Sequence, residues 1–522
     1  MIIDNIIELT KNSSDDNEYL IDNQKYIVKL VFINPDGSVL PLSKSNLNEL
    51  TINDNTFEPF NYSTISFVDN DNSFQRLNTD KSETEFQPEL DILKGYNFRG
   101  DGRDFLFIEI IPVENTNTSY GLQEEDYYKK FGYRNLFVCI DDNENVENGN
   151  KIKRFNLMDF DHKLLKERKS FFSSSNLIES ETPKFLLSNK DREVSTGICI
   201  KNLLKNILLA KSFDQIVDVI GDDFTPDFED GVSKIFYTST GNNNAYEDLL
   251  YILSKHVSDY SNNDFSIFKK DNFTNKYSLR SVSSLFDNAY NDGNDSAGNQ
   301  NLEKIIITGS SDSDNFIQNS KKTPITIASF GQYSEVKDIK FFNTDSLINS
   351  NKLTTKALHS YNFNEKSFNV DKKESDLVNV RENFDKNYVK NMKGDQNEPY
   401  PNFLINQTKS LNLGFDNEYS LYGENTFLKQ SEGLNKLLKS SIITNLAAEI
   451  TLKGQLFRRS GKFISIDREG QYVDNLFDKK FLGIYFILNV DHLFINDTTY
   501  LNKILAVKTY IFDNPKFSEN TL

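Results

Sequence analysis

The chain has 522 residues, too many for one ordinary hydrophobic core, so we expect two to four domains. Its formal net charge is −18, with 59 Lys and Arg residues against 77 Asp and Glu residues, and no long basic run occurs. Tight binding to nucleic acid or to an anionic membrane needs clustered basic side chains, so the composition argues against both. Only two cysteines occur, which excludes a disulfide scaffold.

The start of the chain, MIIDNIIELT, has no basic region, and Asp4 interrupts its apolar residues, so we expect no signal peptide. The most apolar stretch, residues 481–490, is half the length needed to cross a bilayer. We therefore expect a chain that folds in the cytosol and does not insert into a membrane.

Residues 1 to about 180 have the pattern of antiparallel β structure with long loops. In YIVKLVFINPDGSVLPL, two apolar runs flank the turn residues 34–37, which predicts a hairpin. Further strand candidates are YSTISFVDNDN, DFLFIEIIPV and the pair within LFVCIDDNENVENGNKIKRFNLMDF.

Two helices are predicted next. Apolar residues recur at helical spacing in STGICIKNLLKNILLAKS. A second helix follows Asn244, because Glu247 stands three residues later in a capping-box pattern, and His256 is expected within this helix. A third helix is expected from Gly433 to about Leu446, after the weakly periodic stretch 340–435. Strands are then expected at 449–457, 462–467, 481–494 and 503–512.

Motifs for chemistry are largely missing. The four histidines are far apart, and no HExxH, CxxC, G-x-S-x-G or Walker lysine occurs. Two acidic loops, at 69–80 and 312–314, lack the glycine or glutamate of a calcium loop. His492 is the remaining catalytic candidate, but at the end of an apolar strand a structural role is favoured. We therefore predict no catalytic residues, no metal site and no cofactor.

The last 90 or so residues resemble the closing β unit of tail hub proteins from contractile-tailed phages and the related type VI secretion spikes. The resemblance rests on a glycine-led strand, then Gly483-Ile484-Tyr485 and the residues that follow, as in G-x-Y-x-[IV]-x-x-V-x-H. Its matching positions, which are our structural and interface candidates, are Gly454, Arg458, Arg459, Gly461, Ile464, Ile466, Gly483, Tyr485, Val490, His492 and Tyr500. RSVSSLF at 280–286 and the segment from 433 resemble upstream parts of hubs from large myoviruses.

The resemblance implies a mainly β fold with α+β insertions and two tube-forming β-barrel-like domains per chain. The implied division is 1–180 for the first tube domain, 181–235 with 436–522 for the second, and 236–435 for an inserted domain. It also implies a homotrimer that adapts a six-fold tail tube to a three-fold spike and encloses a DNA channel, for which the acidic composition predicts an acidic lining.

The implied partners are other copies of the chain, the trimeric spike, tail tube or tube-initiator proteins, and the tape measure protein. The implied location is the baseplate of the virion tail, after assembly in the host cytoplasm. Two alternatives stay open: a peripheral baseplate or host-recognition module, and an enzyme that hydrolyses a cell-wall polysaccharide, because carboxylate pairs are defined by spatial separation and not by sequence spacing.

Overall fold

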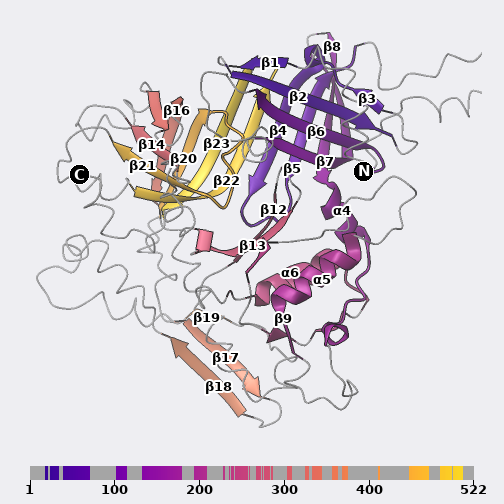
Figure 1. Ribbon diagram of the computed structural model, residues 1–522, viewed down its shortest axis with the longest axis vertical. Coiled ribbons are helices and arrows are strands. Elements are labelled where there is room, and N and C mark those ends of the chain that lie inside the picture. The colour runs from indigo at the N-terminus through magenta and orange to yellow at the C-terminus, as the bar shows by residue number, and fades with distance from the viewer. Residues whose placement is uncertain are drawn as a thin grey trace, which may run out of the picture.

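The computed structural model describes residues 18–21, 24–34, 39–70, 102–113, 132–147, 149–178, 193–208, 227–229, 234–235, 237–239, 241–256, 258, 266–271, 273, 276–282, 284–285, 303–307, 324–327, 332–343, 356–362, 367–373, 409–411, 446–468, 483–496 and 498–508. β strands dominate these residues, as predicted, and most of the strands belong to one large sheet (Figure 1). Among the described helices, none has both the length and the apolar character to cross a membrane.

The first β unit is an antiparallel, curled sheet with the strand order β1-β2-β6-β7-β8-β5-β4, in which β3 also pairs with β2. Its strands are β1 (Glu18–Ile21), β2 (Gln24–Ile33), β3 (Val39–Pro41), β4 (Leu47–Asn55), β5 (Tyr62–Val68), β6 (Phe105–Val113), β7 (Tyr133–Glu147) and β8 (Asn150–Asp159). The predicted β2–β3 hairpin is confirmed, with Ile33 opposite Val39. The pairing of β7 with β8 is confirmed as well.

The second β unit is a closed circuit of strands. Each strand pairs with the next in the order β22-β21-β14-β15-β16-β20-β23, and β23 pairs again with β22. Its strands are β14 (Glu303–Ile307), β15 (Pro324–Ile327), β16 (Gln332–Asn343), β20 (Leu446–Lys453), β21 (Phe463–Arg468), β22 (Gly483–Ile495) and β23 (Thr499–Lys508). Buried residues of this circuit, such as Ile450, Val490 and Ile504, form one core cluster.

One strand joins the two units. The second half of β22 pairs with β23 on one edge and with β4 on the other, where Asn489–Ile495 lie antiparallel to Asn55–Glu49. The two units therefore share one continuous sheet and lie side by side (Figure 1). Phe494 and Tyr500 of the second unit enter the core cluster of the first unit.

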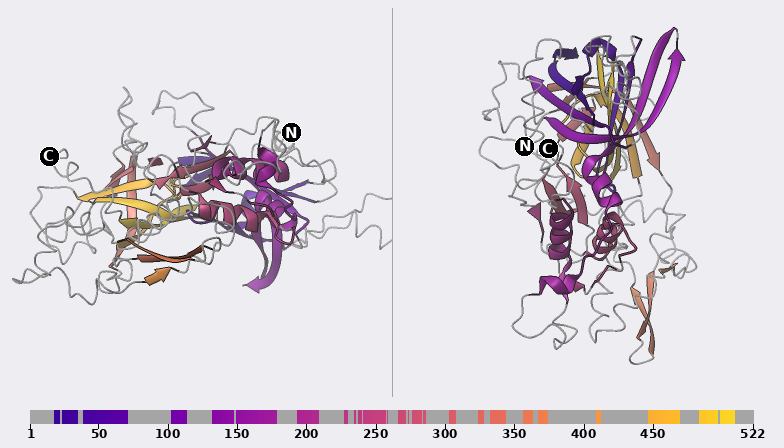
Figure 2. Two further views of the ribbon diagram at one scale, coloured as in Figure 1. Left: turned by 90° about the horizontal axis from the view of Figure 1, so that it is seen from below. Right: turned by 90° about the vertical axis from the view of Figure 1, so that its right-hand side faces the viewer.

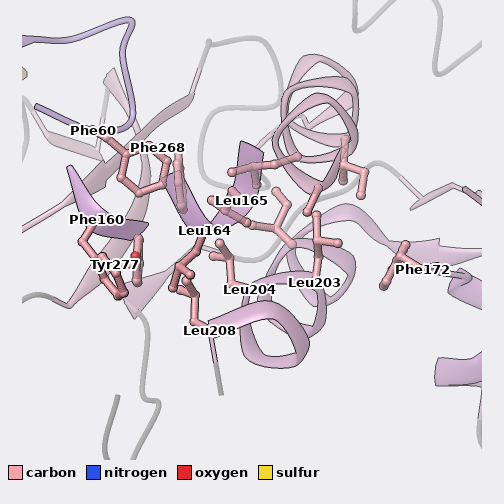
Figure 3. Packing of buried hydrophobic residues seen from close by; sticks show 14 of the residues in the cluster. Phe60, Phe160, Leu164, Leu165, Phe172, Leu203, Leu204, Leu208, Phe268 and Tyr277 are labelled. Carbon is pink, nitrogen blue, oxygen red and sulfur yellow. The ribbon is translucent and has the colours of Figure 1, made fainter. Parts of the chain in front are cut away.

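A layer of helices lies at one end of the first unit, below its strands in Figure 1 and in the right-hand view of Figure 2. It contains α4 (Phe160–Glu167), α5 (Thr196–Leu208) and α6 (Ala245–Lys255), with the short helices η2 (Lys44–Asn46) and η5 (Ser174–Leu177) elsewhere along the chain. Leucines of α4 and α5 pack with Phe60, Phe268 and Tyr277 (Figure 3). Their core also includes Phe107 and Val138 of the sheet, on the face opposite the first unit's own core.

Three small sheets complete the described chain. β10 (Asp227–Phe228), β13 (Tyr277–Ser281) and β12 (Ser266–Lys270) form the first, and β9 (Val194–Ser195) pairs with β11 (Lys234–Ile235) in the second. The third contains β18 (Ser367–Lys373), β17 (Lys356–Asn362) and β19 (Lys409–Leu411) and lies apart from the other elements in Figure 1.

Local predictions have mixed outcomes. The capping box of Asn244 and Glu247 is confirmed. His256 does not lie within α6 but caps its end, because the helix stops at Lys255 and the backbone of His256 is extended. The strand expected at 449–457 ends at Lys453, and Leu446, expected in a helix, begins that strand. The rest of the 433–446 prediction and most of both acidic loops lie outside the described residues.

Candidate functional site

The candidate residues from the sequence motif lie in one region of the second β unit. Gly454 to Gly461 occupy the loop between β20 and β21, and the other candidates lie on β21, β22 and β23. Ile464, Ile466, Tyr485 and Val490 are buried together in the core of the strand circuit. These four side chains fill the interior of the circuit and are at most 1% exposed.

His492 is held in a buried, neutral state. Its Nδ1 accepts hydrogen bonds from the Tyr500 hydroxyl, at 2.7 Å, and from the Asn502 amide, at 2.9 Å. Burial, together with the charges of Arg459 and Arg458, lowers the pKa of His492 to about 4, and the charge of Asp54 opposes this shift. With a tyrosine and an amide as partners of Nδ1 and 1% exposure, the ring has the surroundings of a framework residue.

Arg458 is the largest fully buried side chain among the described residues. Its guanidinium donates to the Lys453 carbonyl and, at 3.0 Å, to Asn502 Oδ1. Asn502 Oδ1 also accepts from the backbone N–H of Gln455 at 2.6 Å. Asn502 thus connects Arg458 to His492, and the loop after β20 is fixed to β22 and β23 from inside. The sequence alone did not indicate this role for Asn502.

Gly454 allows the closest approach in this region. A Cβ built there would lie 2.2 Å from the Tyr500 ring, and the Gly454 N–H donates to the Tyr500 carbonyl at 2.8 Å. Tyr500 in turn stacks on Phe494, with ring centroids 3.9 Å apart. Only a residue without a side chain fits against this pair of rings.

Gly461 and Gly483 both adopt left-handed backbone angles, with φ of +79° and 126°. Gly461 also donates its N–H to the Ile487 carbonyl at 2.9 Å. These angles disfavour other residues at the two positions, because a side chain makes such backbone conformations unfavourable.

Three consecutive charged residues, Lys269, Lys270 and Asp271, connect the β12 region to different parts of the molecule. Lys269 Nζ lies 2.8 Å from Asp54 Oδ1 of β4. Asp271 Oδ2 accepts from Arg459 at 2.9 Å. Arg459 therefore points toward the first β unit, where it also donates to the Gly132 carbonyl at 2.8 Å.

Asp54 is the acceptor at the centre of the β4 contact. Its carboxylate accepts from the Ser460 N–H at 2.9 Å and the Ser460 hydroxyl at 2.7 Å. Burial opposes ionisation of Asp54, but the charge of Lys269 and these hydrogen bonds outweigh burial and hold its pKa below the usual value. The ionised carboxylate joins β4, β12 and the loop before β21.

Lys270 is the middle residue of the triplet and is buried between two carboxylates. Its Nζ lies 3.2 Å from Asp159 Oδ2 and 2.8 Å from Asp161 Oδ2, and Tyr277 donates to Asp161 at 2.5 Å. Burial alone would lower the pKa of Lys270, but the two aspartates raise it. Burial and the neighbouring Asp161 raise the pKa of Asp159. No sequence pattern indicated this cluster, because its members come from distant segments.

Within the described ranges, no group of three or more His, Cys, Asp and Glu side chains is arranged to hold a metal ion. Neither cysteine forms a disulfide, and both are buried, Cys139 in the first unit and Cys199 on α5. The geometry at the candidate residues suits positioning of strands and loops.

The chain matches no family model and no curated protein. It is similar to a tail protein from Neisseria meningitidis MC58, with 7% identity and a TM-score of 0.46 over 93% of this chain and 98% of that one. It is also similar to the 43 kDa tail protein of prophage MuSo2 from Shewanella oneidensis, with 9% identity and a TM-score of 0.41 over 93% and 100%.

A third solved structure is a Francisella PdpA–VgrG complex, with 12% identity and a TM-score of 0.42. The match covers 98% of this chain and 56% of that one. The neighbours fall in the class that the sequence resemblance named.

Proposed function

We propose that this chain is the central hub of a contractile-tail baseplate. In this role, three copies form a ring that adapts the six-fold tail tube to the three-fold spike and leaves a channel for DNA. The observation that carries the proposal is the pair of β units in each chain, joined edge to edge by β4 and β22. Three copies of a two-unit chain supply six β units around one axis, which is the number a six-fold tube requires.

The domain division expected from the sequence forms part of the proposal. Residues 1–180 make the first tube domain, and 181–235 with 436–522 make the second, with 236–435 inserted. In addition, β14, β15 and β16 from the 303–343 stretch pair within the strand circuit of the second unit. The inserted segment therefore contributes strands to the ring-forming part.

The hub works by shape and has no turnover of its own. Supporting observations are the burial of His492, at 1% exposure, and the use of Arg458 and Asn502 to fix a loop. Its partners are other copies of itself, the spike, tube or tube-initiator proteins, and the tape measure protein. Obligate interfaces between copies bury upwards of about 2,000 Å² and are largely apolar.

Light scattering coupled to size-exclusion chromatography tests the proposal. We expect the full-length chain to have the mass of a trimer, alone or on addition of the spike protein encoded with it. A peripheral module has no need of a three-fold state. A chain that remains a single subunit under both conditions contradicts the hub assignment.

The hydrolase alternative has a separate test. Purified protein is added to peptidoglycan, and the loss of turbidity is followed over time. We expect no loss. Turbidity loss that disappears on replacement of one carboxylate by its amide would establish the enzyme and remove the structural assignment.

A further inference from the structure

One face of the shared sheet crosses both β units and presents side chains that are mostly half-buried or exposed. It is formed by six neighbouring strands in the order β8-β5-β4-β22-β23-β20. We call this face the outer face. One row of paired residues runs straight across it: Asn156, Thr64, Thr51, Leu493, Leu501 and Lys453. All six side chains are half-buried, while their sequence neighbours are buried in the cores.

Burial along the strands shows which face is free. Along β4 and β23, buried residues alternate with half-buried or exposed ones, as expected when only one face packs on a core. In contrast, the middle of β6 is buried at five consecutive residues. On its second face, Phe107 belongs to the core shared with the helices, and Glu109 forms ion pairs with Lys29 and Arg134. No described helix or hairpin provides a similar cover for the outer face.

The outer face is also nearly neutral. The paired row and the rows on either side contain three basic residues, Lys453, Lys503 and Arg154, and two acidic residues, Asp491 and Glu49. Lys503 lies opposite Asp491 in the strand register. The other positions are mostly amides, hydroxyls and aliphatic side chains. This balance is unusual in a chain with a net charge of −18.

Building on the proposed function, we infer that the outer face is the wall of the DNA channel. A ring of copies needs an inward surface that spans both β units, and the outer face spans them through the β4–β22 pairing. A basic wall would bind the phosphate backbone and hold it. A wall without net charge and rich in Asn and Thr neither retains the polymer nor repels it strongly. The acidic lining expected from the composition does not describe this face.

Thiol accessibility tests the inference. A single cysteine is introduced as Thr64→Cys at the centre of the paired row, and Thr51→Cys serves as a second variant on the adjacent strand. The matched control is Lys201→Cys on the exposed side of α5. The two native cysteines are buried, so their background reaction is slow. Each variant is treated with a small maleimide and with a maleimide carried on a folded protein too wide to enter a channel.

In the trimer, we expect Thr64→Cys to react with the small reagent but an order of magnitude or more slowly with the large one, while Lys201→Cys reacts with both. In dissociated subunits, Thr64→Cys and Lys201→Cys should each react with both reagents. If Thr64→Cys in the trimer reacts with the large reagent as fast as with the small one, the face lies on the outside of the ring. This result overturns the inference but leaves the proposed trimer intact. If Thr64→Cys in the trimer reacts with neither reagent, the face is buried between copies, and this result also overturns the inference. Absence of any trimer removes the hub itself.

Discussion

At the scale of single residues, two candidate positions show how the loop and strands are held: Gly454 allows close packing, and His492 is a buried, uncharged hydrogen-bond acceptor. Gly454 and His492 illustrate the two effects, since one leaves room for the Tyr500 ring and the other accepts a hydrogen bond from its hydroxyl. The sequence motif indicated both positions but could not indicate their common partner, Tyr500, as the reason. That reason depends on the β22–β23 register, which places Tyr500 opposite Phe494.

Replacing Gly454 with alanine should destabilise the second β unit strongly. The new methyl group would overlap the Tyr500 ring at 2.2–2.4 Å, and that ring is fixed by stacking on Phe494. We expect a loss of about 3 kcal/mol, at the upper end for overpacked cores. Urea unfolding followed by tyrosine fluorescence measures it.

The control is Gly149→Ala, at a position with φ of +83° and open space around the Cβ. It should cost only the backbone strain, about 1 kcal/mol. Equal effects at the two glycines would show that the ring contact is unimportant.

The neutral state of His492 makes stability depend on pH in a defined direction. The folded pKa is about 4 and the ordinary value is 6.5, so the unfolded chain takes up a proton more readily between these values. The contribution of His492 is complete above pH 6.5 and is lost as the pH falls toward 4. Its size is about 3 kcal/mol.

Urea midpoints of the native chain and of His492→Gln between pH 7 and pH 4 test this prediction. The variant should be less stable at pH 7 but should lose less stability on acidification. Parallel pH profiles for the two proteins would contradict it. Burial also lowers the pKa of His162 to about 4. Because His162 is present in both proteins, both should keep the same remaining dependence of stability on pH.

At the scale of elements, the strands and helices with strong local patterns were predictable. The β2–β3 hairpin and the α6 capping box follow from turn and cap residues that lie within a few positions of each other. The pairing of β14 with β21 was not predictable, because it joins residues about 160 positions apart in parallel and its strands are short. The contacts of Lys269, Lys270 and Asp271 were missed for the same reason, since each partner belongs to another segment.

Lys270 should be essential for attaching the β12–β13 hairpin to β8 and α4. In Lys270→Met, the buried carboxylates of Asp159 and Asp161 lose their cation, and we expect a loss of about 3–5 kcal/mol. Chemical denaturation provides the measurement. The control, Lys205→Met on the exposed side of α5, should change stability by less than about 0.5 kcal/mol. A well-folded Lys270→Met protein with native stability would refute the role.

Gly483 begins β22 and should be required for assembly. Its φ of 126° is unfavourable for a β-branched residue, so Gly483→Val should shift the start of the strand that joins the two units. We expect loss of the trimer in light scattering. Thr499→Val, at a half-buried position of β23, should assemble normally. A soluble Gly483→Val variant that still binds the spike would count against this prediction.

At the scale of the whole molecule, the charge distribution disfavours binding of DNA. The chain has a net charge of −18, and the outer face carries almost none of it. Neither the surface as a whole nor the inferred wall offers the clustered basic residues that hold phosphates. The composition alone predicted the weak interaction with nucleic acid, whereas the neutral face became visible only from the strand register.

The assembled protein should show no measurable affinity for a short labelled duplex at physiological salt. Fluorescence anisotropy of the duplex, titrated with the trimer, provides the measurement. Thr51→Lys combined with Thr64→Lys adds six positive charges to a trimeric channel and should produce salt-sensitive retention. Binding by the unmodified protein at micromolar concentration would contradict the expected absence of retention.

The strand shared by the two units has a mechanical consequence. The contact between β4 and β22 spans seven paired residues, Glu49–Asn55 against Ile495–Asn489, and both strands are flanked by other strands. A load directed along these strands would strain all the rungs of the ladder together, and the rungs would not open one after another. In the hub that we propose, contraction of the tail would load each subunit. A seam of this geometry would transmit the part of that load directed along the strands from one half of the subunit to the other without tearing.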